Sequence, residues 1–244
     1  MAKREPQMTE SEKLNTKPCL WDAHTHRADA PVGEAIVHCS PADFRPRRGE
    51  WYSLGIHPWY IDRELSAVGD GAPAGPDVDS LLANHRPLFA HPQVLAIGEA
   101  GIDKLRGGDV ERQIKLFVLQ ARLAEELHKP LIVHMVRSLP ELLQAKHDLR
   151  PRSPWIVHGF RGSPDMALQM LSHGLLLSFG EHYRPETLRA VPIDRLFLET
   201  DESRLPIEAI YRQAAQTRGT SLEELRQAVA KNVEQVFFPY LCRS

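Results

Sequence analysis

Two stretches of the chain, Pro130-Leu-Ile-Val-His-Met-Val136 and Pro154-Trp-Ile-Val-His-Gly-Phe160, share one pattern. Each is a short apolar run that begins after a proline and reaches a histidine, His134 or His158, near its end. An apolar run of about four to eight residues bounded by Pro or Gly is typical of a strand buried on both faces, as in parallel sheets. The pattern therefore predicts two strands of a parallel sheet, each with a polar side chain near its end.

The same pattern occurs eight times along the chain. The other six runs are residues 19–26, 34–39, 51–58, 94–101, 175–180 and 195–201. Apolar residues at helical spacing occupy most of the segments between the runs, as at Ile114, Phe117, Val118 and Ala121. Eight alternating strands and helices in 244 residues predict an α/β fold, namely a TIM-like (β/α) barrel, whose usual length is about 250 residues.

Short sequence signals mark where several helices begin. Ser138 with Glu141 and Ser221 with Glu224 match the capping-box pattern, in which two side chains satisfy the free amides of a first turn. Ser163-Pro164-Asp165 matches a capping serine followed by a proline in the first turn. We therefore expect helices to start at these three places.

The alternation is interrupted between the second and third runs. Residues 41–50 are too few and too rich in proline to form a crossover helix. We therefore expect an irregular barrel with a missing helix between the second and third strands. Residues 1–17 are polar and lack any hydrophobic period, which predicts a disordered tail before a barrel domain of residues 18–244. A Gly- and Pro-rich loop is expected at residues 69–76.

Polar residues with metal-binding atoms stand at the ends of five of the runs. They are His24, His26, Glu99, His134, His158 and Asp201. Because the carboxyl ends of barrel strands converge on one mouth, we expect these side chains to form one cluster. Imidazole and carboxylate together suit zinc, manganese or iron more than calcium, which prefers oxygen alone. A single histidine of this kind is more often structural, but burying six such groups without a metal carries a large desolvation cost.

Six motifs stand in order along residues 19–238: Asp22-Ala-His-Thr-His26, Gly55-Ile-His-Pro58, Gly98-Glu-Ala-Gly-Ile-Asp103, Val133-His134, His158-Gly-Phe-Arg-Gly162 and Leu198-Glu-Thr-Asp201. As a set they resemble the TatD-type metal-dependent deoxyribonucleases, within the wider amidohydrolase-like metal-dependent hydrolases. The resemblance implies two divalent metal ions, from among zinc, manganese and magnesium. It assigns His24, His26 and Asp201 to one ion and His134 and His158 to the other, with Glu99 bridging. It also implies DNase activity, often as a 3′→5′ exonuclease, on single strands or 3′ ends.

The sequence differs from the family's pattern in three places. Val136 stands where the family commonly has an arginine, and Arg137 comes one position later. Arg161 replaces the serine that usually follows the Gly-Phe of the sixth run, and the segment between the first and third runs is shortened. None of these differences falls on a candidate ligand, so we expect them to affect the choice of substrate.

The residue types also indicate catalytic roles. Asp201 is the candidate to orient a water molecule and accept its proton, although a role as ligand alone fits equally well. Glu99 suits a bridging role because a carboxylate offers two oxygens to two ions. Glu199 is expected to be structural.

Substrate contacts are expected from residues just beyond the strand ends. His57, Arg137 and Arg161 are candidates to bind a backbone phosphate, while each arginine could equally be an ordinary solvated side chain. Asp103 is expected to orient a ligand or a water molecule.

Composition limits the possible functions. Thirty basic and 32 acidic residues give a net charge of −2, so a phosphate-bearing substrate needs a local basic patch. No apolar run approaches the roughly 18 residues of a membrane span, and the polar start lacks a signal sequence, which predicts a cytoplasmic protein without a membrane partner. Three cysteines form no close pair, and no obligate protein partner is evident. Two alternatives remain: an amidohydrolase that cleaves a C–N or ester bond of a small molecule, and a binding module with a degenerate site, which the intact six-residue set disfavours.

Overall fold

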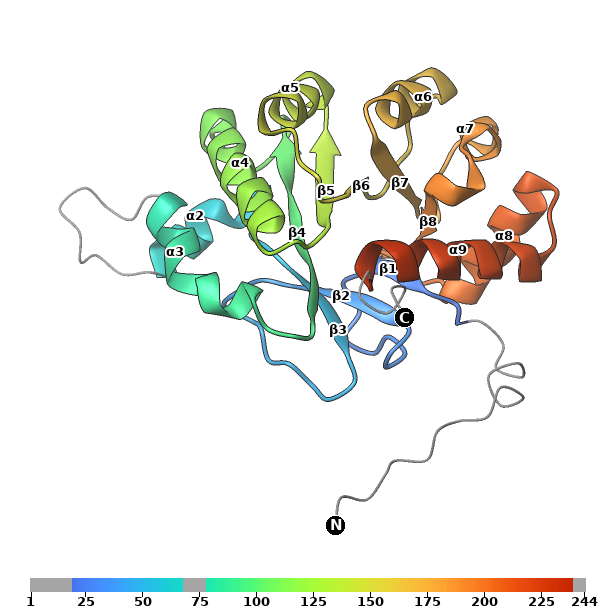
Figure 1. Cartoon of the computed structure of the whole chain (residues 1–244), viewed down its shortest axis with the longest axis horizontal. Helices are drawn as coiled ribbons and strands as arrows, with labels where there is room; N and C mark the ends of the chain where they lie inside the picture. The colour runs from blue at the N-terminus through green and yellow to red at the C-terminus, as the bar shows by residue number, and fades with distance from the viewer. Residues whose placement is uncertain (1–18, 68–77, 239–244) are drawn as a thin grey trace, which may run out of the picture.

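The chain folds into a parallel eight-stranded barrel (Figure 1). The computed structural model describes residues 19–67 and 78–238, so the predicted tail at 1–17 and the whole of the predicted loop at 69–76 lie outside the described residues. The strands are β1 (Asp22–Thr25), β2 (Ala35–Cys39), β3 (Trp51–Leu54), β4 (Val94–Asp103), β5 (Leu131–Val136), β6 (Trp155–Val157), β7 (Leu175–Phe179) and β8 (Leu196–Leu198). They pair in chain order, and a bridge between Thr25 and Asp201 brings the first strand beside the segment after the last. The predicted TIM-like barrel is confirmed.

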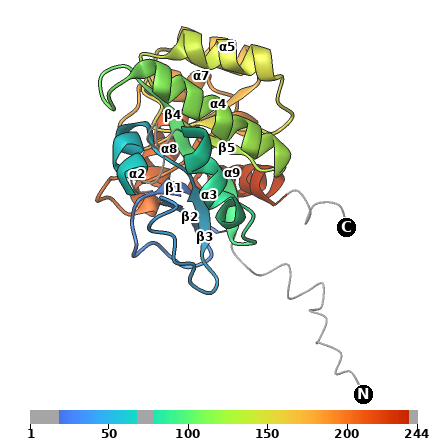
Figure 2. The same cartoon turned by 90° about the vertical axis from the view of Figure 1, so that its left-hand side faces the viewer.

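Helices follow the strands from β3 onward. They are η1 (Pro58–Tyr60), α2 (Ile61–Ala67), α3 (Val78–Phe89), α4 (Val110–Glu126), α5 (Leu139–Leu149), α6 (Pro164–Ser172), α7 (Pro185–Ala190), η2 (Ile193–Arg195), α8 (Ile207–Arg218) and α9 (Leu222–Phe237). In Figure 1 the helices α4 to α8 follow one another around the strands, and Figure 2 shows α3 beside α4. No described helix is long and apolar enough to cross a membrane.

The side of the barrel at β1, β2 and β3 lacks crossover helices. Residues 40–50, between β2 and β3, contain no helix, as predicted. Residues 26–34, between β1 and β2, contain none either, a second interruption that the sequence analysis did not locate. The physical reason is length, because nine residues joining adjacent parallel strands are too few for a helix and its two turns. The chain turns there instead, with Gly33 at a φ of 81°.

The barrel core explains the apolar runs. Every residue of β1, β6, β7 and β8 is buried, as expected of strands that are covered on both faces. On the outside, α4 buries Leu116, Phe117 and Ala121 against the sheet, and the Phe117 ring packs edge-on against Trp155 at 5.4 Å. Burying one such aromatic or leucine side chain contributes about 1.5–3 kcal/mol.

The three predicted helix starts have different outcomes. The capping box of Ser221 and Glu224 is present at α9, and Ser163 accepts a hydrogen bond from Met166 N at the start of α6. Ser138 does begin α5, but the predicted capping box is wrong because its side chain makes no cap hydrogen bond. Its Oγ is buried and donates instead to Ile102 O at 2.7 Å, which ties the loop to β4.

A buried carboxyl joins β1 to the residues after β8. Asp22 Oδ1 accepts a hydrogen bond from Thr200 N at 2.9 Å, and Oδ2 accepts one from Thr200 Oγ1 at 2.6 Å. Asp22 is 3% exposed, and burial raises its pKa to about 7. In the unfolded chain the same carboxyl has a pKa of about 3.9, so folding favours its protonated form.

This difference predicts a pH dependence of stability. The stabilising contribution of protonated Asp22 is complete below about pH 4 and is lost as the pH rises toward 7, at about 1.4 kcal/mol per pH unit. Asp22→Asn removes this group, so the stability difference between wild type and variant should change over that window. Urea unfolding of the metal-free proteins between pH 5 and 8 measures it. Asp194→Asn, at a carboxyl that is 70% exposed, is the control and should run parallel to wild type. If the free energy of unfolding of Asp22→Asn changed with pH in parallel with that of wild type, the prediction would be contradicted.

Candidate metal centre

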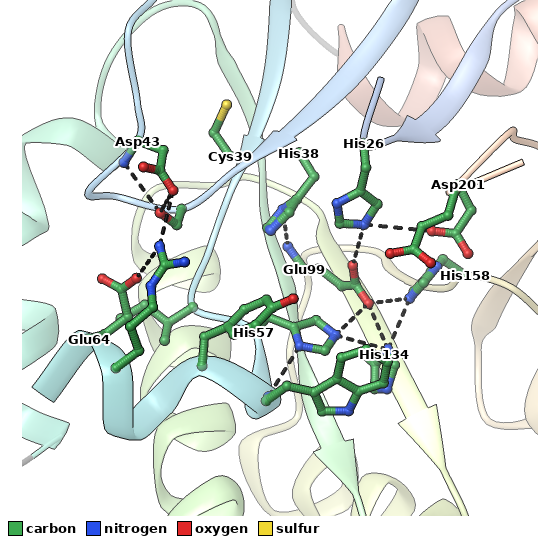
Figure 3. Close-up of a pocket in the computed structure, with 16 residues that line it drawn as sticks. His26, His38, Cys39, Asp43, His57, Glu64, Glu99, His134, His158 and Asp201 are labelled. Carbon is green, nitrogen blue, oxygen red and sulfur yellow. Dashed lines mark hydrogen bonds and ion pairs between the residues drawn. The ribbon is translucent and has the colours of Figure 1, made fainter. Parts of the chain in front are cut away.

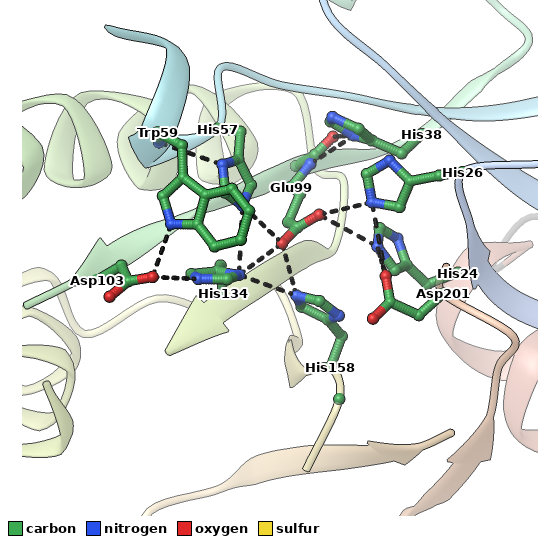
Figure 4. Close-up of polar contacts among 12 residues, drawn as sticks. His24, His26, His38, His57, Trp59, Glu99, Asp103, His134, His158 and Asp201 are labelled. Carbon is green, nitrogen blue, oxygen red and sulfur yellow. Dashed lines mark hydrogen bonds and ion pairs between the residues drawn. The ribbon is translucent and has the colours of Figure 1, made fainter. Parts of the chain in front are cut away.

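The carboxylate of Glu99 lies at the centre of the barrel mouth, near the middle of β4, and is 2% exposed. Its Oε1 atom is surrounded by three imidazoles (Figure 4). His134 Nδ1 lies 2.6 Å away, His158 Nε2 lies 2.7 Å away and His57 Nε2 lies 3.0 Å away. These three rings come from β5 and from the segments after β6 and β3.

The second oxygen of Glu99 faces the end of β1. His26 Nε2 lies 3.1 Å and His24 Nε2 lies 3.3 Å from Oε2. Asp201 completes this side, with Oδ1 at 3.6 Å from His26 Nε2 and 3.9 Å from His24 Nε2. The six residues predicted as ligands therefore lie together in one cluster.

The backbone fixes Asp201 against β1. Asp201 N donates to His24 O at 3.0 Å, and His26 N donates to Asp201 O at 3.1 Å. Asp201 has a φ of 52°, in the left-handed region that Asp and Asn enter more readily than most residues. This turn sets the direction of the carboxylate, which is 27% exposed.

The cluster is electrostatically coupled. Burial alone would raise the pKa of Glu99, but the surrounding imidazoles, His158 first, hold that pKa well below its usual range. The same pairing, with Glu199 adding to it, overcomes the burial of His158 and raises its pKa well above the usual value. Burial lowers the pKa of His57, and its contact with Glu99 opposes this only in part.

The donor atoms fit divalent metal ions. Three sets have all their ligand atoms within 4.8 Å of one another: His24, His26 and Glu99; His24, His158 and Asp201; and His57, Glu99 and His134. His24 is 1% exposed, its Nδ1 has no hydrogen-bond partner among the described residues, and its Nε2 has only the ion-pair contacts with Glu99 at 3.3 Å and Asp201 at 3.9 Å. Buried imidazole nitrogens without partners are costly unless they bind a ligand, and mixed imidazole and carboxylate sets suit zinc or manganese.

Asp103 orients one of these imidazoles. Its Oδ2 accepts a hydrogen bond from Trp59 Nε1 at 2.6 Å and lies 3.4 Å from His134 Nε2. This contact directs the opposite ring nitrogen, Nδ1, toward Glu99. Asp103 thus has the contacts of an orienting residue, and Trp59 is a contributor that the sequence did not indicate.

His38, on β2, was not predicted as a site residue. Its Nδ1 accepts a hydrogen bond from Glu99 N at 2.9 Å and lies 3.1 Å from Gly98 O. Accepting this N–H places the ring's own proton on Nε2. A signal for it existed, because Ala35-Ile-Val-His38 is an apolar run that reaches a histidine, as the run at His134 does.

Glu199 was expected to be structural, but it also contacts a candidate metal ligand. It is fully buried, and its Oε1 accepts a hydrogen bond from Gly159 N at 2.6 Å. The same oxygen lies 3.5 Å from His158 Nδ1. The carboxylate therefore holds both the ring of a candidate ligand and the backbone that follows it.

Two hollows meet at the cluster and share Trp59, His134, His158, Asp201 and Glu202. We call the first the inner cavity, of about 290 Å³, which extends past the cluster to residues of β2 and α2. Its other lining residues include His38, Ser40, Asp43, Tyr60, Arg63 and Glu64 (Figure 3).

We call the second hollow, of about 890 Å³, the arginine groove, because Arg137, Arg161 and Arg184 line it. Arg137 and Arg161 were predicted near the site, whereas Arg184 was not. Within residues 19–67 and 78–238 none of the three side chains forms an ion pair or a hydrogen bond. The groove is therefore a local basic patch on a chain whose net charge is −2.

An eight-stranded α/β barrel with imidazoles and carboxylates at the carboxyl ends of its strands defines a class of metal-dependent hydrolases. The profile of the TatD related DNase family matches residues 47–238, and the chain belongs to this family.

Similar proteins carry related names. The chain is 28% identical to the uncharacterized metal-dependent hydrolase YjjV of Escherichia coli, over 86% of this chain and 88% of that protein. The crystal structure of YjjV superposes with a TM-score of 0.71 at 22% identity, over 90% of this chain and 98% of the other. A protein of Erwinia tasmaniensis named 3'-5' ssDNA/RNA exonuclease TatD is 28% identical, over 77% of this chain and 78% of that protein. The chain spans only 58% of an uncharacterized metal-dependent hydrolase of Buchnera aphidicola, at 26% identity.

The geometry predicts the effect of removing ligands. Glu99→Gln and His134→Ala should each lower metal content and reduce hydrolysis at least about 100-fold, beyond the loss typical of residues that only support ligands. The far-ultraviolet circular dichroism should not change, because both side chains lie at the mouth and outside the packed barrel layers. Elemental analysis, turnover and circular dichroism on the same samples test this.

Two histidines away from the mouth serve as controls. His147 is 75% exposed on α5, and His85 lies on α3, so His147→Ala and His85→Ala should keep metal content and turnover. Full metal content in Glu99→Gln, or loss of the fold, would show that Glu99 is not the ligand at the centre.

Proposed function

We propose that this protein is a metal-dependent nuclease that hydrolyses phosphodiester bonds of single-stranded DNA, from a 3′ end. The observation that supports this most directly is the position of the arginine groove, which joins the candidate ligand cluster and holds three arginines without an ion-pair partner among the described residues. Membership of the TatD related DNase family and the exonuclease name of the Erwinia relative agree with this proposal.

The cluster has ligands for two ions. In this proposal His24, His26 and Asp201 hold one and His134 and His158 hold the other, with Glu99 between them. The two oxygens of Glu99 already face the two groups of imidazoles. Divalent ions in such a site supply Lewis acidity, which activates water near neutral pH and stabilises negative charge developing on a phosphate.

Asp201 is suited to proton transfer. Both Glu99 oxygens are engaged by imidazoles, and Glu99 is 2% exposed, so a water molecule reaches Asp201 more easily at 27% exposure. In this proposal Asp201 orients the attacking water and accepts its proton, while Glu99 would hold the metal with its two buried oxygens. Asp103 and Glu199 fix the rings of His134 and His158, so that those rings need little rearrangement when substrate binds.

The arginine groove accounts for the recognition of phosphate. Guanidinium groups bind phosphate oxygens in a bidentate way, and such contacts position a strand without reading its sequence. Arg161 follows His158 by three residues, so a phosphate beside His158 is near Arg161. His57 completes the phosphate contacts on the opposite side of Glu99, unless it serves as a further ligand with His134.

The role of Arg161 is testable through salt dependence. Arg161→Ala removes one phosphate contact, so the KM on an end-labelled single-stranded oligonucleotide should rise for every sequence. The slope of log affinity against log salt should become shallower by about 0.7, because one fewer counterion is released. Metal content should not change, since guanidinium does not ligate cations.

Arg195→Ala is the matched control, because Arg195 precedes β8 and lies at the opposite end of the barrel. It removes the same charge and should leave the KM and the salt slope unchanged. Equal effects of the two substitutions would argue against a phosphate site at Arg161. If the wild type cleaves no oligonucleotide but hydrolyses a substrate from an amide and ester panel, the amidohydrolase alternative replaces the nuclease.

A further inference from the structure

The two hollows that meet at the ligand cluster differ in charge. Beyond the residues they share, the arginine groove adds three arginines that have no ion-pair partner in residues 19–67 and 78–238. The charged side chains that the inner cavity adds away from the cluster are Asp43, Glu64 and Arg63. The Arg63 guanidinium lies 3.1 Å from Asp43 Oδ2 and 3.4 Å from Glu64 Oε1, so its charge is already offset. A chain of phosphates is attracted to the groove, and the inner cavity suits a group without charge.

The inner cavity is also small compared with the length of a nucleic-acid strand. Figure 3 shows Asp43 and Glu64 on one side of it and Glu99, His158 and Asp201 on the other. Asp43 accepts a hydrogen bond from Ser40 Oγ at 2.8 Å and pairs with Arg63, so an ion pair lines the edge of the cavity away from Glu99. A volume of about 290 Å³ lies at the lower limit of small-ligand pockets, about 300 Å³, and leaves room for one nucleoside but not for a continuing strand.

An exposed aromatic ring lines this cavity. Tyr60, the last residue of η1, is 45% exposed, and its ring centroid lies 5.6 Å from that of His57. The Arg63 guanidinium lies 5.4 Å from the same ring. Exposed tyrosines beside an active centre are suitable platforms for stacking a nucleobase, and such stacking tolerates any base.

A polar atom is also available in the cavity. His38 lines it, and its Nδ1 is engaged by the backbone of Glu99. Its Nε2, which carries the proton, has no hydrogen-bond partner within the described residues. With Nδ1 accepting from the backbone, the ring offers its Nε2–H to an uncharged oxygen such as a sugar hydroxyl.

We propose that the inner cavity is a pocket for the terminal nucleoside of the strand, with its base on Tyr60, its sugar at His38 and a free hydroxyl toward Asp43. The phosphates of the rest of the strand lie in the arginine groove. This inference rests on the proposed nuclease function. A phosphate on the terminal nucleoside would meet Asp43 and Glu64, so the pocket selects ends that carry a hydroxyl.

The first experiment varies the substrate. Single-stranded oligonucleotides of one sequence carry an internal fluorophore and end in a hydroxyl-bearing nucleoside, a terminal phosphate or an abasic residue, each placed at the 3′ or the 5′ end. For the wild-type holoenzyme, a phosphate at the attacked end should lower kcat/KM at least about tenfold. Asp43→Asn removes one repelling charge and frees Arg63, so it should narrow this difference.

The second experiment varies the platform. Tyr60→Ala should raise the KM for the base-bearing end about fivefold or more and leave the KM for the abasic end at its wild-type value. Tyr60→Phe keeps the ring and should restore the dependence on the base. Fluorescence anisotropy of the holoenzyme with oligonucleotides whose terminal linkage resists hydrolysis measures the same contrast as a dissociation constant, independently of turnover.

The outcomes separate the two proposals. Cleavage with the expected end preference and base dependence supports both. Cleavage that ignores the terminal phosphate, or equal effects of Tyr60→Ala on base-bearing and abasic ends, overturns the nucleoside pocket and leaves the nuclease function intact. Absence of cleavage of every oligonucleotide by the metal-loaded wild type overturns both.

Discussion

The buried carboxylate of Glu99 is the group on which the mouth of the barrel depends. A charge that is 2% exposed is very costly unless partners surround it, and five imidazole nitrogens within 3.3 Å provide those partners. The rings come from segments that are far apart in the sequence, so the barrel must close before Glu99 is compensated. Closure of the barrel and assembly of the site therefore depend on each other in this chain.

Close approach of neighbouring strands makes this arrangement possible. A Cβ atom on Gly98 would lie 2.5 Å from Ile132 O, and one on Gly101 would collide with His134 O. Gly98 also has a φ of 132°, which side-chain-bearing residues rarely adopt. These two glycines let β4 and β5 approach near Glu99, so that His134 Nδ1 reaches Glu99 Oε1 at 2.6 Å. The motif around Glu99 is thus explained by packing as much as by metal binding.

The sequence predicted what depends on local pattern and missed what depends on contacts between segments. Eight apolar runs were sufficient to predict the barrel. The polar ends of five of them brought six polar residues to one mouth, because parallel strands share an end. The capping box at Ser138 failed because β4 offers Ile102 O to its hydroxyl, which local pattern does not show. His38 was overlooked although its run resembles the others, because its partner is the backbone of Glu99, 61 residues away. His57 was expected only as a phosphate contact. In the structure its Nε2 lies 3.0 Å from Glu99 Oε1, a distance similar to those of the candidate metal ligands.

The irregular side of the barrel connects these points. Where β1, β2 and β3 follow one another without helices, short loops form the rim, and Ser40 and Asp43 from one of them line the inner cavity. Where helices follow β5, β6 and β7, the loops that precede those helices carry Arg137, Arg161 and Arg184, whose side chains have no ion-pair partner among the described residues. The net charge of −2 hides this division, because it averages a basic side of the mouth with an acidic one. In the proposed nuclease, the direction of a bound strand follows from connectivity, since the side of the mouth without crossover helices is acidic and unsuited to phosphate.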